Sequence, residues 1–251
     1  MPEKLNLKIP LIFAHRGANS FAPENSLPAF QKAIELGCQG IELDVRYTAD
    51  KNVVVFHDKN TFRLTGVRQN IQKLTLSQIK KFKLHQKDFP EEKIPTLSEV
   101  LEIVRDKVLI NIDVKKGHLI GNGFEEKILK ILQDFRLVEN VIISSFNPFV
   151  LKKIASLNPV VHLGYIFRNR TSLFMLNGQS VQSLHPSFRI LNQRYISHLK
   201  EKTNWVYAWT VDNAHDMLDL IKNKVDGIIS NKPEVFFQLI DKIRNTKILT
   251  K

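Results

Sequence analysis

The chain has 251 residues, of which 43% are hydrophobic and 25% are charged. This balance is typical of a folded globular protein and excludes a disordered chain. Its 37 lysines and arginines exceed its 25 acidic residues by 12, an excess that attracts anions of many kinds without selecting one. The single cysteine, Cys38, excludes an intrachain disulfide framework and a multi-cysteine metal site, and we expect a buried, unreactive thiol there.

The apolar segments are too short for a membrane span or a signal peptide. No run approaches the roughly 20 apolar residues of a transmembrane helix. The first apolar run, residues 11–14, is also shorter than a signal-peptide core of about 7–15 residues. We therefore expect a cytoplasmic protein without stable membrane insertion.

Short apolar runs alternate with helical patterns along most of the chain. The pattern predicts eight main strands, at residues 11–14, 41–45, 108–114, 141–145, 161–166, 180–184, 205–209 and 227–230. Helices are predicted between most of them, at residues 26–36, 96–105, 125–133, 149–157 and 214–222. Eight strands alternating with helices at this length predict an α/β protein with a (β/α)8 (TIM) barrel, with a doubly wound open sheet as the alternative.

One further apolar run, Val53–Phe56, follows the second strand after only residues 46–52. A parallel crossover needs about a dozen residues or more, so we expect an antiparallel hairpin here. The following segment, residues 59–93, is irregular apart from a short helical pattern at residues 77–82, and it carries nine Lys/Arg against three Asp/Glu. We therefore expect a single domain, residues 1–251, with an accessory insertion at about residues 46–95.

Polar residues interrupt the apolar strands at their carboxyl ends, which form the catalytic face of a barrel. They are His15, Arg16 and Gly17 after the first strand, Glu42 and Asp44 on the second, His57 and Asp58 after the hairpin, and Asp113 and Lys115 on the third main strand. The two-residue period of a strand puts Glu42 and Asp44 on one face. A turn near Asp50 would return His57 to the level of Leu43 and Asp44. These pieces should therefore meet at one mouth.

The residue types at this mouth suit metal-assisted phosphoryl chemistry. Three carboxylates in one space repel each other, so they require a raised pKa, cationic neighbours or a bound metal. Oxygen donors favour Mg²⁺ or Ca²⁺ over Zn²⁺. Two histidines suit general acid and general base catalysis, and Arg16 and Lys115 supply positive charge for phosphoryl oxygens. Each pair alone is more typical of a turn or a surface ion pair, and only their joint placement favours an active site.

The ordered motifs of this chain resemble the signature of the glycerophosphodiester phosphodiesterase family. They are His15-Arg16-Gly17, Pro23-Glu24-Asn25-Ser26, Glu42-x-Asp44, His57-Asp58 with Leu64-Thr65-Gly66, residues 94–101, residues 111–115, Ser144-Ser145-Phe146, Trp209-Thr210-Val211 and residues 226–229. These motifs cover nearly the whole chain in family order, so the set is far more specific than any one of them.

The resemblance implies a metal-dependent barrel enzyme that cleaves glycerophosphodiesters into sn-glycerol 3-phosphate and an alcohol, with Mg²⁺ or Ca²⁺ as cofactor. It implies a role for each matching position: His15 and His57 as the acid/base pair, Glu42, Asp44 and Asp113 as metal ligands, Arg16 and Lys115 on the phosphate, and Glu24 and Asn25 at the metal or just behind its ligands. The nucleophile would be water or the adjacent glycerol hydroxyl.

Aromatic residues near the strand ends are candidates for the pocket of the alcohol. Trp209 and Phe146 are the main ones, with Phe21 as a third. The remaining histidines show no partner pattern, and we expect them to be structural; they are His118, His162, His185, His198 and His215.

Three positions depart from the family pattern. Asp113 stands where the family usually has Glu, which makes this predicted ligand one methylene shorter. Ser26 replaces the commoner Thr at a helix start, where either hydroxyl can cap. Ser230-Asn231 replaces Thr-Asp near the last strand, which removes a negative charge from the mouth.

Two alternatives remain open at this point. A lysophospholipase D-like or phosphoinositide-type phosphodiesterase would act on lipid with the same metal site, and the basic insertion and the basic tail at residues 242–251 could favour an anionic membrane surface. A non-catalytic anion- or nucleic-acid-binding barrel is the other, but such a module need not keep both histidines. We expect a small soluble diester as substrate and no nucleic-acid partner.

Overall fold

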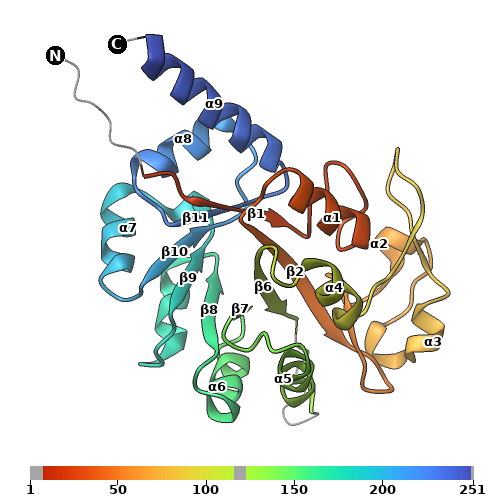
Figure 1. The fold of residues 1–251 in the computed structure, drawn as a ribbon. Coiled ribbons are helices and arrows are strands. Elements are labelled where there is room, and N and C mark those ends of the chain that lie inside the picture. The colour runs from red at the N-terminus through yellow and green to blue at the C-terminus, as the bar shows by residue number, and fades with distance from the viewer. Residues whose placement is uncertain (1–7, 116–122, 250–251) are drawn as a thin grey trace.

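The computed structural model describes residues 8–115 and 123–249, and within them eight parallel strands close into a barrel (Figure 1). These strands are β1 (Leu11–His15), β2 (Gly40–Tyr47), β6 (Leu109–Val114), β7 (Val141–Ser145), β8 (His162–Phe167), β9 (Ser183–Pro186), β10 (Trp205–Ala208) and β11 (Gly227–Ser230). Strand β1 pairs in parallel with both β2 and β11, which closes the sheet. The predicted (β/α)8 barrel is confirmed, and the open sheet is excluded.

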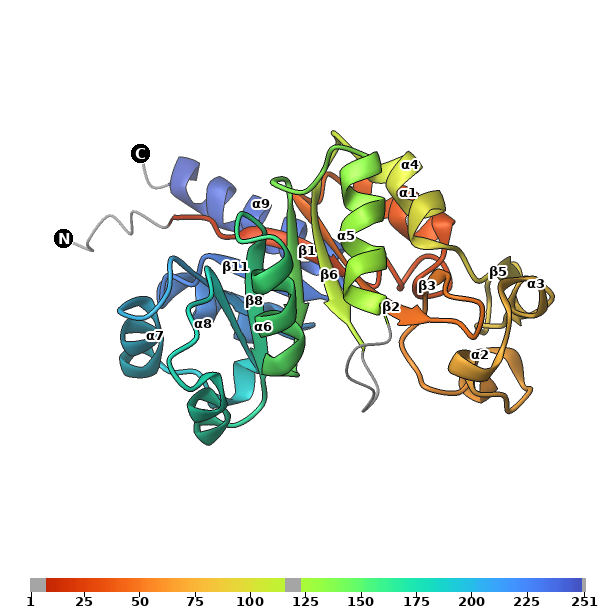
Figure 2. The same ribbon diagram turned by 90° about the horizontal axis from the view of Figure 1, so that it is seen from below.

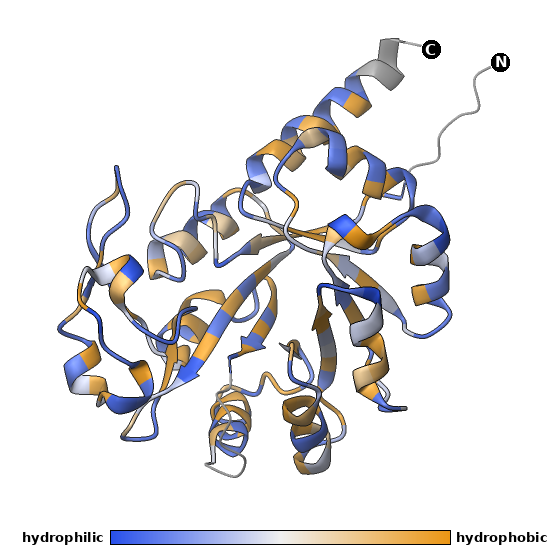
Figure 3. Ribbon diagram, turned by 180° about the vertical axis from the view of Figure 1, so that it is seen from behind, coloured by the Kyte–Doolittle hydropathy of each residue, from blue (hydrophilic) through white to orange (hydrophobic). Residues whose placement is uncertain are grey.

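Helices surround the barrel and cover its outer face. They are α1 (Leu27–Glu35), α4 (Leu97–Val104), α5 (Phe124–Asp134), α6 (Pro148–Leu157), α7 (Gln193–Lys200), α8 (Ala214–Lys222) and α9 (Pro233–Leu249). Apolar and polar residues alternate along them (Figure 3), as helices with one face on a barrel require. In α1, Ser26 caps the first turn by accepting from the Ala29 amide, and the residues that face the core are Ala29, Phe30 and Ala33.

Small residues make room for large ones inside the barrel. A Cβ atom on Gly40 would lie 2.2 Å from the Phe13 ring, and one on Gly164 would lie 2.6 Å from Nε2 of His185. Glycine is therefore required at both positions by the close approach of a ring on the neighbouring strand. This arrangement lets His185 point into the barrel.

The predicted hairpin is present and has the predicted register. Strand β3 (Val53–Val55) pairs antiparallel with β2, with Val55 opposite Val45. The Phe56 amide then donates to the Asp44 carbonyl oxygen at 2.9 Å, which returns His57 to the level of Leu43.

The accessory segment after β3 packs around a small apolar cluster of its own. Its elements are α2 (Phe62–Thr65), the 3₁₀ helix η1 (Ile71–Lys73), α3 (Leu76–Ile79), β4 (Lys83–Leu84) and β5 (Glu92–Lys93). Its buried cluster comprises Val54, Phe56, Leu64, Ile71, Leu74, Ile79, Leu84 and Ile94. The segment lies on the side of the barrel away from α7 (Figures 1 and 2). Part of its positive charge is neutralised locally, since Lys80 pairs with Glu99 and Lys83 with Glu91.

The strand predicted at residues 180–184 is wrong by about three residues, because β9 is Ser183–Pro186. The preceding connection contains the 3₁₀ helix η2 (Arg170–Leu176), which ends at Asn177 and Gly178 in left-handed conformations. Val181 then packs against the core without strand pairing. His185 therefore lies within the strand and not after it.

Two further expectations concern membranes and the cysteine. None of the described helices combines the length and the apolar character needed to cross a bilayer. Cys38 is buried, as expected, and burial together with Glu234 raises the pKa of its thiol to about 12.

Candidate active site

The sequence-predicted residues of the first three barrel strands lie side by side because of strand register. His15 on β1 stands opposite Glu42 on β2. On the next pair of strands, Asp44 stands opposite Asp113. The carboxylates of Glu42, Asp44 and Asp113 all lie within 4.8 Å of one another by one oxygen each, and all three residues are buried. Barrel pairing therefore assembles the acidic triad that the sequence predicted.

Glu42 has few cationic contacts, so little of its negative charge is compensated. Its Oε2 accepts the Arg16 backbone amide at 3.1 Å and lies 3.8 Å from Nε2 of His15. Burial and repulsion from Asp44 and Asp113 raise the pKa of Glu42 well above its usual range.

Asp44 has the opposite environment. Its Oδ2 accepts from Nδ2 of Asn25 at 2.8 Å and lies 3.2 Å from Nε of Arg16, and its Oδ1 lies 3.0 Å from Nζ of Lys115. Burial raises the pKa of Asp44, but the two cations outweigh it and hold that pKa well below the ordinary value. Asn25 is thus placed directly behind one predicted metal ligand.

Lys115 lies between two of the carboxylates. Its ammonium group contacts both Asp113 and Asp44. Burial raises the pKa of Asp113 to about 6 even beside this ammonium group, whereas the surrounding carboxylates overcome burial and raise the pKa of Lys115. The lysine predicted to bind phosphate therefore also neutralises part of the triad.

Both predicted catalytic histidines are held through their Nδ1 atoms. Nδ1 of His15 lies 2.7 Å from Oδ1 of Asn231, and Nδ1 of His57 lies 2.7 Å from Oδ1 of Asp58. Each partner oxygen accepts a hydrogen bond from the ring N–H at Nδ1, which leaves Nε2 for proton exchange. Burial and Arg16 lower the pKa of His15 to about 4, and burial lowers that of His57 despite Asp44.

Arg16 belongs to a network of ion pairs at the rim. Its Nη1 donates to Glu24 at 2.9 Å, and Glu24 also accepts two bonds from Arg63. Arg63 in turn donates to Asp58, the partner of His57. Glu24 is therefore engaged with two arginines, and the structure does not place it among the three clustered carboxylates.

The predicted residues open into a pocket of about 100 Å³. It is lined among others by His15, Arg16, Glu42, His57, Asp113, Lys115, Phe146 and Trp209. Phe146 and Trp209 meet edge to face with ring centroids 5.4 Å apart, and the Trp209 indole donates to the His185 carbonyl oxygen at 2.8 Å. Phe21 lines no part of this pocket, contrary to the expectation for it, and it carries Lys32 over its ring.

Four residues to which the sequence motifs assigned no catalytic or binding role also belong to this region. Asn111, Arg168 and His185 line the pocket, and Asn231 orients His15. The sequence offered a signal for two of them. Asn111 precedes Asp113 by two residues, which is the period of a strand, and Arg168 directly follows an apolar strand. The sequence predicts a structural role for His185 because it shows no partner pattern, and the predicted strand ended one residue before it.

Among the other predicted structural histidines, His162 bonds Ser183, whereas His198 and His215 lie on exposed helix surface. His118 lies outside the described residues.

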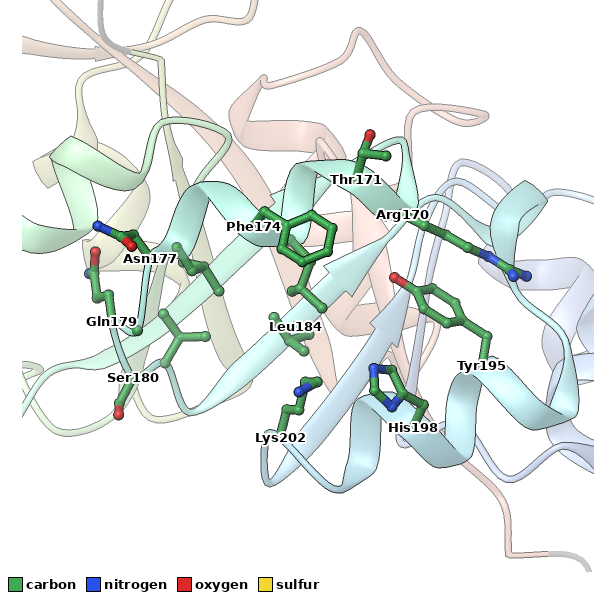
Figure 4. Close-up of a pocket in the computed structure, with 14 residues that line it drawn as sticks. Arg170, Thr171, Phe174, Asn177, Gln179, Ser180, Leu184, Tyr195, His198 and Lys202 are labelled. Carbon is green, nitrogen blue, oxygen red and sulfur yellow. The ribbon is translucent and has the colours of Figure 1, made fainter.

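A larger cavity of about 930 Å³ lies elsewhere, between η2 and α7 (Figure 4). It occupies the place where the β8–β9 connection has a short 3₁₀ helix instead of an α-helix. None of the clustered carboxylates or of the two predicted catalytic histidines lines it. The smaller pocket is therefore the candidate active site.

Comparison with known proteins agrees with this placement. Residues 15–235 match the profile of the glycerophosphoryl diester phosphodiesterase family. The chain belongs to this family. The match begins at His15 and includes every residue of the acidic triad.

Relatives of the family cover almost the whole chain. A glycerophosphodiester phosphodiesterase of Caldanaerobacter subterraneus subsp. tengcongensis is 38% identical over 239 residues, which are 92% of this chain and 98% of that protein. The solved structure of a glycerophosphodiester phosphodiesterase from Thermotoga maritima is 29% identical and has a TM-score of 0.74, covering 92% of this chain and 98% of the other.

A second family structure contains a product. It is an Oleispira antarctica phosphodiesterase in complex with sn-glycerol-3-phosphate, 26% identical, with a TM-score of 0.81 over 93% of this chain and 97% of the other. Both solved structures therefore match this chain's barrel over more than nine-tenths of its length.

Proposed function

We propose that this family member hydrolyses glycerophosphodiesters to sn-glycerol 3-phosphate and an alcohol. The observation that carries the proposal is a pocket lined by His15, His57, Arg16 and Lys115 together with two carboxylates of the buried acidic triad, whose third member, Asp44, contacts Arg16 and Lys115. A binding module does not need two proton-transfer groups held by their Nδ1 atoms, so this arrangement supports catalysis.

The acidic triad fits a hard divalent cation. Glu42, Asp44 and Asp113 offer only oxygen donors, and Oδ1 of Asp113 is buried with no hydrogen-bond partner among the described residues. Such a set suits Mg²⁺ or Ca²⁺, and these three residues would hold it. The bound ion would supply Lewis-acid stabilisation of the negative charge that develops on the phosphoryl group.

Separate side chains bind the phosphoryl group, transfer protons and contact the alcohol. Arg16, at the pocket and paired with Asp44 and Glu24, binds the phosphoryl oxygens. One histidine accepts a proton at Nε2 from the nucleophile, whose oxygen forms a bond to phosphorus. The bond from phosphorus to the alcohol oxygen breaks, and the other histidine donates a proton to that oxygen. Aromatic contacts with the departing alcohol come from Phe146 and Trp209.

The nucleophile is water or the adjacent hydroxyl of the glycerol group. In the second route, the hydroxyl oxygen forms a cyclic phosphate, and water opens the ring in a later step. A diester that lacks this hydroxyl separates the routes, because it is cleaved only if water attacks directly.

The test of the function is the release of sn-glycerol 3-phosphate from a panel of diesters, with Mg²⁺, with Ca²⁺ and with neither. We expect metal-dependent cleavage of glycerophosphocholine or another soluble diester in preference to lysophosphatidylcholine, measured with and without vesicles. Release from none of them with either ion would refute the proposal. The single-domain organisation, the cytoplasmic location and the lack of a nucleic-acid partner stay predictions.

A further inference from the structure

A second cavity adjoins the candidate active site at the end of β8. It has a volume of about 330 Å³, and its lining includes Asn169, Ser172 and Met175. Phe146, Ile166 and Arg168 line both this cavity and the site pocket. The two spaces therefore meet along one shared wall.

The size of the site pocket decides how a diester would occupy the two cavities. Pockets that enclose small ligands usually have volumes of about 300–1,000 Å³, whereas the site pocket has about 100 Å³. It is too small to enclose a whole glycerophosphodiester. A phosphate bound near Arg16 and His15 would leave one substituent outside, on the side where the adjoining cavity shares Phe146 and Arg168 with this pocket.

Arg168 is the charged group at the boundary. The Cζ atom of its guanidinium lies 5.6 Å from the Phe146 ring centroid and 5.5 Å from that of Trp209. The Lys115 ammonium lies 5.5 Å from the Phe146 centroid. Cationic side chains therefore already lie near the rings of Phe146 and Trp209. A quaternary ammonium headgroup is recognised through the same attraction to aromatic faces, so it would compete with Arg168 and be repelled by it.

Arg168 differs from Arg16 and Lys115 because no carboxylate neutralises its charge in the described part of the chain. Arg16 pairs with Glu24 and Asp44, and Lys115 pairs with Asp44 and Asp113. In the described part of the chain Arg168 forms no ion pair with a carboxylate, and no Asp or Glu lines the second cavity. Arg168 is an exposed residue, and a guanidinium group has donors suited to a phosphate or carboxylate.

We propose that the cavity between β8 and η2 is the leaving-group subsite and that Arg168 selects diesters whose alcohol carries negative charge. The best class is a phosphorylated polyol, followed by a neutral polyol, with choline last. This selection rests on the proposed hydrolysis, since it concerns the group that leaves. Arg168 determines specificity and carries no proton-transfer role.

The test compares kcat/KM for three diesters of sn-glycerol 3-phosphate, in which the alcohol is glycerol 3-phosphate, glycerol or choline. We expect wild type to favour the phosphorylated headgroup over choline by at least about tenfold at low ionic strength, a difference of about 1.4 kcal/mol. High salt should reduce this ratio, because screening weakens the contribution of an exposed charge.

Substitution isolates the contribution of Arg168. Arg168→Gln should lower the ratio about tenfold, mainly by raising kcat/KM for the choline diester and lowering it for the phosphorylated one, whereas Arg168→Lys should keep the order of preference. The matched control is Arg170→Gln, which removes another exposed arginine two residues later that lines neither of these two cavities. It should leave the ratio unchanged.

Two outcomes contradict different claims. A wild-type preference for choline, or an Arg168→Gln ratio equal to that of wild type in a variant with unchanged thermal unfolding, overturns the role of Arg168. Failure of wild type to cleave any of the three diesters with Mg²⁺ or Ca²⁺ contradicts the proposed hydrolysis itself.

Discussion

His15 and Asn231 contact each other across the closure of the barrel, with Nδ1 of His15 2.7 Å from Oδ1 of Asn231. The amide of Asn231 is oriented by Asp212, because its Nδ2 donates to Oδ2 of Asp212 at 2.8 Å. The oxygen therefore faces His15, and the proton of the neutral ring lies on Nδ1. The residue that directly follows the last strand thus fixes the tautomer of a histidine on the first strand.

Asn231→Ala removes this acceptor. We expect kcat to fall about 10- to 100-fold with little change in KM, since the effect of an orienting partner is felt mainly in the chemical step. Steady-state kinetics on one soluble diester measure this. Asn204→Ala changes an exposed asparagine before β10 and serves as the control. A wild-type kcat for Asn231→Ala would show that the contact does not orient His15 for catalysis.

Chelation should abolish activity if the acidic triad holds the cofactor. Excess EDTA followed by dialysis is expected to leave an inactive protein, and Mg²⁺ or Ca²⁺ should restore turnover. In Asp113→Ala the concentration of ion needed for half-maximal activity should rise, because one of three buried donors is lost. Full activity in excess EDTA would show that the reaction needs no bound metal ion.

Glu24 should contribute more to stability than an ordinary surface carboxylate. It accepts bonds from Arg16 and Arg63, and its side chain is only 12% exposed. Glu24→Ala leaves Arg16 with less compensation and should lower the free energy of unfolding by about 1–3 kcal/mol, as measured by urea denaturation. Glu35→Ala breaks only an exposed pair with Lys32 and should change that energy by less than about 0.5 kcal/mol. Equal effects of the two substitutions would contradict a structural role for the Glu24 network.

Buried His185 should make the fold sensitive to acid. Burial lowers the pKa of His185 from 6.5 to about 3, so the folded ring stays neutral while the unfolded chain binds a proton below about pH 6.5. The contribution of His185 to the free energy of unfolding is therefore fully present above this pH. It declines as the pH falls towards 3, by up to about 1.4 kcal/mol per pH unit.

Urea denaturation at several pH values tests this dependence. Between pH 7 and pH 5, wild type should lose about 2 kcal/mol more than His185→Asn. The control is His215→Asn, since the His215 side chain is 83% exposed, and its pH profile should follow wild type. The same profile for His185→Asn and wild type would mean that His185 does not drive the decline.

The fold was predictable because strands and helices alternate regularly along the sequence. Strand runs separated by helical patterns predicted eight parallel strands, and barrel pairing confirmed them. The error at β9 has a physical cause: Val181 is apolar and packs on the core but pairs with no strand. Apolar character alone could not distinguish it from Leu184, which is in the strand.

The site was predictable where chemistry and strand period coincide. Glu42 and Asp44 lie two residues apart on β2 and Asp113 lies on the neighbouring β6, and the parallel register places Asp113 opposite Asp44. Asn231 and Arg168 were not predictable in this way, because their roles depend on contacts between segments far apart in the chain. Long-range contacts of this kind leave no periodic pattern in the sequence.

The most direct test of the central claim is the rate at which sn-glycerol 3-phosphate is released by wild type, His15→Ala and His57→Ala under identical metal-saturated conditions. General acid–base catalysis by both rings predicts that each substitution lowers kcat by about two to four decades while the proteins remain folded. Near-normal turnover in both variants would contradict the assignment of the two histidines and the mechanism built on them.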